Sequence, residues 1–249
     1  MLHKLLHTII ILLLGTLLML TLSFTARESK NALCSNIEIT FNEDELIKIS
    51  RDEILRLVKA ADNDIIGSEL RKINADHIER EVEKHQTILK AEVYKVTVKD
   101  SSSYSGILGV RVSHRTPAVR IMSTSGSYYL DKNGEVIPVS GNYTANVLVV
   151  TGYFSEEFAI EKLLPFVLHI NKSPFWKAQI EQVHVEKSGD IILTPLVGSH
   201  LIELGSLENY EGKLIAMRAF YDQVLTKNNW NKYETISLKF KNQVIAKKR

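Results

Sequence analysis

The longest apolar stretch of the chain lies near the N-terminus, where residues from Leu5 to Phe24 are hydrophobic apart from His7, Gly15 and scattered Thr and Ser. About 20 residues in a helix cover the ~30 Å hydrocarbon layer of a bilayer, whereas the apolar core of a secretory signal has only about 7 to 15. The pattern therefore predicts a transmembrane anchor. A cleaved signal peptide is the alternative, because Lys4 gives a short basic start and a cleavage site would fit within residues 23–26.

The next patterns predict a small unit with the order strand, helix, helix, strand, strand. Residues 37–41 alternate between apolar and polar, as in a half-buried strand. Ser50 with Glu53 matches a capping box, and Asn74 is placed to cap a second helix. Alternation returns from residue 94 to residue 112, around a serine-rich turn. The residues expected in its core are Ile39, Ile54, Leu57, Val58, Ile78, Val82, Val96 and Val112.

After Pro117, short apolar segments alternate with turn signals such as Asp131–Gly134, a spacing typical of an antiparallel sheet. Ser155 is placed to cap a helix that Pro165 would kink or divide. A final helix with one apolar face is expected to pack on the sheet, before a last hairpin. That apolar face consists of Leu214, Met217, Tyr221, Val224 and Leu225.

Together the patterns predict an α+β protein: a transmembrane helix, a βααββ unit, and a mostly antiparallel β-sheet domain with packed helices. The expected boundaries are 1–26 for a short tail and the anchor, 27–35 for a linker, 36–116 for the first unit and 117–249 for the second. The positive-inside rule hardly distinguishes the two possible orientations of the anchor in the membrane. The amino terminus and Lys4 precede the apolar segment, and Arg27 and Lys30 follow it. Only a few residues would remain on the inner side, and the body would be exported.

Composition excludes several classes of function. A net charge of +2 gives no support for the clustered phosphate contacts that bind nucleic acid. Cys34 is the only cysteine, so the chain has no internal disulfide, and no Cys/His metal cluster or redox pair can form around it. The residue before it is Leu33, whereas a lipoprotein cleavage site wants a small residue there, so Cys34 is expected to be an unpaired thiol in the linker.

No spacing that catalysis requires is found. The chain has no nucleophile elbow, no Ser-x-x-Lys, no zinc-binding His-Glu-x-x-His and no phosphate-binding loop. His77–Glu79 and His184–Glu186 lack the second ligand of a zinc helix. A set of Ser125, His114 and Asp131 matches no known arrangement of a catalytic triad. We therefore expect no catalytic residue, no metal, no cofactor and no small-molecule substrate.

Three blocks of sequence, taken in order behind the anchor, resemble the FtsQ/DivIB family of bacterial cell-division proteins. The blocks are Val110–Arg120 with its Arg115-Thr116-Pro117, then Tyr128–Asp131, Gly134, Ile137-Pro138 and Val149–Gly152, then Ile202–Gly205, Lys213-Leu214, Ile236–Phe240 and Val244. In this family the first unit is a POTRA domain. The chain departs from the common pattern in its short tail, in Ser237 where aspartate is usual, and in ending soon after the last strand.

The resemblance implies a non-enzymatic scaffold of the divisome. Such a protein is bitopic in the inner (cytoplasmic) membrane, with its N-terminus cytoplasmic and its body periplasmic, and it acts at the division septum in support of septal peptidoglycan synthesis. Its β domain binds the small coiled-coil proteins FtsB (DivIC) and FtsL, while the POTRA domain and anchor contribute to recruitment. A terminal strand can leave one row of backbone groups for an extended partner to complete. The expected partner-binding residues are Phe240, Asn242, Gln243, Val244, Ile245, Ala246 and Lys248.

Two other functions fit parts of the sequence. A secreted cell-envelope enzyme would follow if the N-terminal segment were a cleaved signal peptide. A POTRA-bearing outer-membrane export protein fits less well, because the POTRA-like unit is not followed by the long run of alternating strands that such proteins require.

Overall fold

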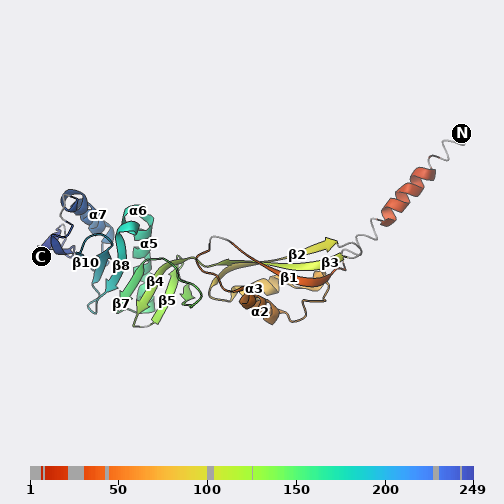
Figure 1. Cartoon of the computed structure of the whole chain (residues 1–249), viewed down its shortest axis with the longest axis horizontal. Coiled ribbons are helices and arrows are strands. Elements are labelled where there is room, and N and C mark those ends of the chain that lie inside the picture. Colours follow the sequence, from red (N-terminus) through yellow and green to blue (C-terminus); the bar gives the residue numbers. More distant parts are fainter. Residues whose placement is uncertain are drawn as a thin grey trace. The chain divides into compact units, whose positions relative to one another are not determined.

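The computed structural model describes residues 7, 9–21, 31–42, 45–99, 104–124, 126–226, 230–241 and 243–249. The chain divides into two compact units (Figure 1). The first contains Met1–Asp44 and Ile49–His114, and the second contains Glu45–Lys48 and Arg115–Arg249. The chain therefore crosses between the units three times. The structure is α+β, with a βααββ unit followed by a large, mostly antiparallel sheet, as the sequence predicts.

The N-terminal segment is helical over residues 9–21. The hydroxyls of Thr16 and Thr21 each donate a 2.9 Å hydrogen bond to the carbonyl three residues back, so these polar groups are satisfied within the helix. The predicted anchor, Leu5 to Phe24, extends beyond the described residues at both ends. Among the helices that the structure describes, none has the combined length and hydrophobicity required to cross a bilayer.

The first unit has the predicted element order. Its elements are β1 (Leu33–Phe41), α2 (Arg51–Ala61), a single 3-10 turn (Leu70–Lys72), α3 (Ala75–Glu83), β2 (Ile88–Lys99) and β3 (Tyr104–His114). Strand β1 begins inside the segment expected to be a linker, and Cys34 is buried in this strand. The sheet order is β1-β3-β2, with β3 parallel to β1 and antiparallel to β2. The last strand of the unit therefore lies in its centre.

The two helices begin where the sequence predicts. The Ser50 side chain accepts a hydrogen bond from the backbone N–H of Glu53, and the Asn74 side chain accepts one from the N–H of His77. Only half of the expected capping box forms, because the carboxylate of Glu53 pairs with Arg56 on the next turn. A side-chain oxygen at each helix start thus satisfies a backbone N–H that has no partner within the helix.

The core of the first unit lies between these helices and one face of the sheet. Ile54, Val58, Ile78 and Val82 from the helices are fully buried, and Ile39 and Val112 are buried on the strands, while Leu57 is partly buried. The assignment of Val96 to this core is wrong, because its side chain is 38% exposed. Ala91 and Val93 face the helices instead. Side chains alternate along a strand, so a shift of one residue exchanges the two faces.

Helix α3 also covers part of the free edge of β2. The carboxylate of Glu79 accepts a 2.6 Å hydrogen bond from the N–H of Val93, and that of Glu83 accepts a 3.0 Å bond from the N–H of Ala91. These two amides point away from β3 and would otherwise be unpaired. Side chains of the helix thus complete the hydrogen bonding at one half of an edge strand.

The second unit is built on nine strands. They are β4 (Pro117–Ser123), β5 (Gly126–Asp131), β6 (Val136–Pro138), β7 (Val149–Gly152), β8 (Ile180–Val185), β9 (Ile191–Pro195), β10 (Leu201–Gly205), β11 (Tyr233–Ser237) and β12 (Ile245–Lys248). Their order is β12-β11-β10-β9-β8-β7-β4-β5-β6. The pairs β10–β11, β7–β8 and β4–β7 are parallel, and the other neighbours are antiparallel. The sheet is therefore mixed, with β12 and β6 at its two edges.

The helices of this unit lie on one side of the sheet (Figure 1). They are α4 (Glu156–Phe158), a π-helical turn (Ala159–Leu163), α5 (Leu164–Lys172), α6 (Pro174–Gln179) and α7 (Tyr210–Phe220), which continues as a π-helical turn (Tyr221–Leu225). Ser155 caps α4 through the N–H of Phe158, as predicted. No break is present at Pro165: the π turn passes directly into α5, and both Leu163 and Leu164 have right-handed helical backbones, so the proline lies within the first turn of α5. On the final helix, the apolar face predicted from sequence is buried except for Val224, which is partly buried.

A small second core involves a residue from far away in the sequence. Ile47 lies between β1 and α2 in the chain, yet it is fully buried in a cluster with Tyr129, Ile137 and Ala145 of the second unit. The Tyr129 hydroxyl accepts a 3.3 Å hydrogen bond from the N–H of Ala145. A segment of only four residues from within the first half of the chain thus completes the packing of the second unit.

We expect Val82→Asp to unfold the first unit and Val96→Asp to be tolerated. The new carboxylate at position 82 would be buried with no partner, which costs about 3 to 5 kcal/mol, whereas a charge at the exposed position should change stability by less than about 1 kcal/mol. Hydrogen exchange of the α3 amides in the full-length protein measures both effects. Equal protection in the two variants would show that the core lies on the other face of the sheet.

We expect Ile47→Ala to destabilise the second unit by about 2 to 5 kcal/mol, because it leaves a cavity beside Tyr129. Both tryptophans, Trp176 and Trp230, belong to the second unit, so denaturant unfolding followed by tryptophan fluorescence reports on that unit. The neighbouring Leu46 is exposed, and Leu46→Ala is the matched control. A tryptophan transition that is the same in both variants would contradict the packing of Ile47.

Candidate functional site

The candidate site is the last hairpin of the chain, at one edge of the nine-stranded sheet. Strand β12 pairs only with β11, in the register Ser237↔Ile245 and Ile236↔Ala246. Strand β11 continues inward by pairing in parallel with β10. Within the described residues, no strand lies on the far side of β12. The predicted edge strand is therefore present, and one row of its backbone groups faces outward.

The register identifies which groups face outward. The N–H of Leu238 donates a 2.8 Å hydrogen bond to the carbonyl of Glu203 on β10. Backbone groups alternate in direction along a strand, so Ser237 faces β12, and its partner Ile245 faces back toward β11. The intervening residue Ala246 points its N–H and C=O to the open edge, as does Lys248.

The predicted partner-binding residues are distributed over this edge and the connection before it. Phe240 is 57% exposed, and its carbonyl accepts a 3.3 Å hydrogen bond from the N–H of Gln243 in a tight turn. Ile245 and Lys248 are exposed, while Val244 and Ala246 are half-buried against the main core. Asn242 lies outside the described residues. The six described residues are thus close in sequence and in space, with apolar inward positions and an exposed aromatic ring.

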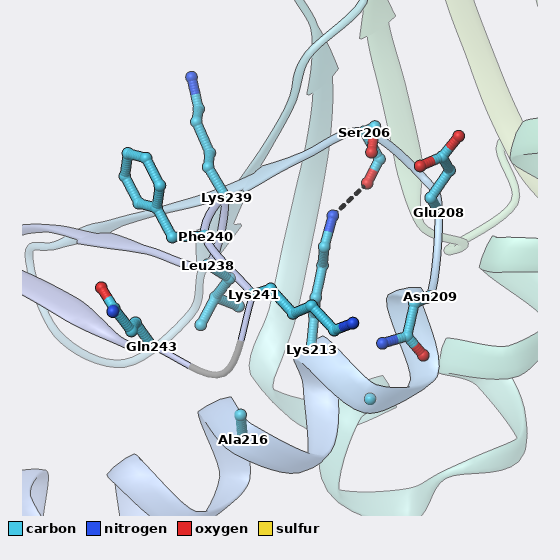
Figure 2. A pocket seen from close by; sticks show the side chains of 11 residues that line it. Ser206, Glu208, Asn209, Lys213, Ala216, Leu238, Lys239, Phe240, Lys241 and Gln243 are labelled. Atoms are coloured by element: carbon cyan, nitrogen blue, oxygen red, sulfur yellow. Dashed lines mark hydrogen bonds between the residues drawn. The ribbon is translucent and has the colours of Figure 1, made fainter.

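A groove of about 520 Å³ lies beside this hairpin (Figure 2). It is formed by the connection Leu238–Lys241 and Gln243 on one side and by the start of α7, with Ser206 and Glu208 before it, on the other. Figure 2 shows Lys241 extending toward Asn209, and Phe240 extending away from α7. Sequence reasoning missed the residues from α7, because nothing in their spacing indicates that they meet the terminal hairpin.

Lys213 shapes one wall of the groove. Its amine donates hydrogen bonds to the carbonyls of Leu204 (3.0 Å) and Ser206 (2.7 Å), which closes the connection between β10 and α7. Burial lowers the pKa of Lys213. Asn209, at the helix start, has a left-handed backbone with φ of 50°. Lys213 therefore acts as a structural support for the loop rather than as a free charge.

Positive charge gathers on the terminal hairpin. Lys239 pairs with Asp190 at 2.7 Å, and Lys247 pairs with Glu234 at 2.8 Å; these hydrogen bonds raise the pKa of each lysine. Lys241 and Lys248 form no ion pair with another residue of the described chain. The surface beside the open edge is thus positive overall and suited to an acidic partner.

The far end of β12 is held in place by Arg249. Its backbone N–H donates a 3.2 Å hydrogen bond to the carbonyl of Lys232, and its guanidinium donates a 2.6 Å bond to the carbonyl of Ser199. The Ser199 hydroxyl donates a 3.1 Å bond to the side chain of Asn231. These bonds tie the short edge strand to the loops before β10 and before β11.

A buried polar network lies beneath these loops. His200 is 1% exposed, and its Nε2 is 3.1 Å from the hydroxyl of Tyr221, which also accepts a 3.4 Å bond from Gln179. Burial raises the pKa of Tyr221 to about 12, so its hydroxyl stays protonated. Burial lowers the pKa of His200, and the carbonyl of Trp230 offsets part of that effect. The neutral form of His200 is therefore the one that the folded protein favours.

Two of the residues considered for a catalytic triad, Asp131 and His114, have other partners. The Asp131 carboxylate accepts hydrogen bonds from the N–H groups of Asn133 (2.8 Å) and Glu135 (3.0 Å) and pairs with Arg115 at 3.0 Å. His114 belongs to the first unit and accepts a 3.3 Å bond from the N–H of Ile49. Ser125 lies outside the described residues. Within the described part of the chain, no group of three or more His, Cys, Asp or Glu side chains is arranged to hold a metal ion.

Fold and site together define a two-domain protein in which a POTRA-like unit precedes a mixed sheet with an open terminal edge. Residues 32–100 match the model of a POTRA-like domain, and residues 116–247 match the family model described as FtsQ/DivIB, C-terminal related. The second match covers more than half of the chain. The chain belongs to the FtsQ/DivIB family, as the resemblance of its sequence blocks indicated.

A curated relative agrees with this assignment. The cell division protein FtsQ of Salinibacter ruber (strain DSM 13855 / M31) is 27% identical over 168 residues. The alignment covers 62% of this chain and 64% of the relative, so the chain spans less than two thirds of that protein's length.

We expect the stability of the second unit to fall as the pH drops below about 6.5, because the unfolded chain then protonates His200 and the folded chain resists it. The free energy of unfolding should fall by up to about 1.4 kcal/mol per pH unit, as long as the folded histidine stays neutral. Denaturant unfolding followed by tryptophan fluorescence, at several pH values, measures this slope. The slope should be smaller in His200→Gln. A slope that is the same in His200→Gln and in the wild type would show that His200 does not contribute.

Proposed function

We propose that this protein is a non-enzymatic scaffold of the divisome, which links septal cell-division proteins of the FtsB/DivIC and FtsL types at the inner membrane. Through these partners it would support septal peptidoglycan synthesis. Family membership supports a role in cell division, and the Salinibacter relative is itself named a cell division protein. The single observation that carries the proposal is the open edge of β12.

An extended segment of a partner would pair with the outward backbone groups of Ala246 and Lys248, adding a further strand to the sheet. Main-chain hydrogen bonds would supply much of the affinity, and they are insensitive to most side-chain changes. Exposed aromatic rings often supply the main side-chain contact at such interfaces, and Phe240 is placed to do so beside the groove. The charges of Lys241 and Lys248 would speed the approach of an acidic partner.

The proposal places the body in the periplasm, held by Leu5–Phe24 with the N-terminus in the cytoplasm. The length and hydrophobicity of this segment in the sequence support an anchor. A scaffold needs to remain at the membrane to bring membrane-bound partners together. Cleavage of the segment would instead release the body, as in the alternative of a secreted envelope enzyme.

We expect Ala246→Pro to weaken partner binding about tenfold or more while the protein stays folded. Proline removes a donor that faces the open edge and distorts the strand, yet no hydrogen bond to β11 depends on that N–H. Affinity for purified FtsB-like and FtsL-like proteins, with thermal unfolding measured in parallel, tests this expectation.

Two variants sharpen the comparison. Ile245→Pro removes a donor that faces β11, so it should lower stability as well as binding. Val244→Ala keeps every donor and should bind nearly as well as the wild type. If Ala246→Pro and Phe240→Glu both fold, stay at the membrane and bind normally, partner recognition lies elsewhere on the β domain.

A further inference from the structure

The outer face of the β1-β3-β2 sheet, turned away from α2 and α3, changes in character along its strands. At the end where the chain enters the unit, one row across the sheet is Leu33, Ser105 and Val98, and the next includes Ile107 and Val96. Leu33, Val96 and Val98 are 52%, 38% and 41% exposed. We call Leu33, Val96, Val98 and Ile107 the apolar end of the sheet.

The opposite end of the same face is charged. Lys90 pairs with Glu92 at 2.7 Å, and Arg111 lies 3.6 Å from the same carboxylate. Between the two ends, the ring of Tyr94 lies flat across Gly109, where an added Cβ would come within 2.2 Å of the ring. The exposed hydrophobic surface of this face is thus confined to one end of the sheet.

The apolar end is also the end nearest to the N-terminal helix along the chain. Only ten peptide units separate Thr21, the last described residue of that helix, from Asn31, which is followed by the buried Ala32. A chain of that length reaches at most about 36 Å. If the helix is embedded in a membrane, the first ordered residues of the unit are held close to the membrane surface.

The side chains next to the apolar end suit a lipid–water interface. Tyr104 begins β3 at this same end of the sheet, where it packs against the core on the face that carries the helices, and the amine of Lys99 lies 5.8 Å from the centre of its ring. Tyrosine and lysine both place an apolar body in the interface and keep a polar tip in water. Arg71 and Lys72 follow in the adjacent 3-10 turn, where Leu70 donates its N–H to the carbonyl of Ala32.

We propose that the apolar end of this sheet rests on the surface of the lipid bilayer, with Val96 and Val98 in the interface and Lys99 at the headgroups. The proposal depends on the membrane anchor of the proposed function. A lipid surface fits better than a second copy of the chain, because the hydrophobic residues gather at the tethered end and the rest of the face carries paired charges. The contact would limit the orientations of the first unit relative to the membrane.

The test uses the full-length protein in vesicles, with nitroxide labels on single cysteines in a Cys34→Ala background. Vesicles are made of phosphatidylcholine alone or with phosphatidylglycerol at about one third, a share that gives an anionic surface. One label replaces Val98, and a matched control label replaces Lys90 at the charged end of the same strand. The measured quantity is the ratio of collisions with oxygen, which is concentrated in lipid, to collisions with a water-soluble nickel chelate.

We expect a several-fold higher ratio at position 98 than at position 90, with a further increase in anionic vesicles due to Lys99. A third label at Ser105, between Leu33 and Val98, reports on the same contact when Val96 and Val98 are both changed to Asp. Because both positions are exposed, the double variant should stay folded yet lose the lipid-like ratio at position 105.

The outcomes separate this inference from the proposed function. Protein that is washed from the vesicles at alkaline pH contradicts the anchor itself. Protein that stays in the vesicles but gives a water-like ratio at position 98 overturns the lipid contact alone. Spin–spin broadening at position 98 that grows with protein density would show that a second copy covers the face, and would likewise overturn the proposal.

Discussion

The constraint on which this structure depends is that every strand at the edge of a sheet leaves backbone N–H and C=O groups that need partners. The protein meets this need differently in its two units. On β2, the carboxylates of Glu79 and Glu83 take up two edge amides, and a helix thereby substitutes for a strand. On β12, nothing in the described chain takes up the outward groups of Ala246 and Lys248. The terminal edge thus keeps a row of backbone groups with which an extended segment could pair, as the proposed function requires.

An open edge is useful only if the strand that presents it is held in position. Strand β12 has four residues, too few to be stable alone. Its inward side chains join the main core through Ala246, and Arg249 ties its end to two loops. Beneath those loops, Tyr221 connects His200 and Gln179 within an aromatic cluster. The position of β12 at the edge of the sheet therefore depends on buried contacts well away from the edge itself.

Local signals in the sequence predicted local structure well. The caps at Ser50, Asn74 and Ser155 depend only on neighbours three residues away, and the stripe on the last helix follows from helical periodicity. The face of β2 that packs against the helices was assigned wrongly, because both faces of the strand carry valines. Val93 faces the helices, and Val96 faces outward. The groove beside the terminal hairpin could not be predicted, because tertiary packing alone brings the start of α7 and the connection Leu238–Lys241 to line the same groove. The terminal hairpin was expected from the family resemblance, which places a closing hairpin at these residues.

The burial of Ile47 in the second unit bears on how members of this family can be recombined. A chimera joined at Arg115 would take its first half from one protein and its β domain from another. Residues 45–48 would then come from the wrong parent, and the side chain beside Tyr129 and Ile137 would not match its surroundings. A sound exchange has to transplant this four-residue segment together with the β domain. The set of residues that must be exchanged together is therefore discontinuous in the sequence, although each domain is compact in space.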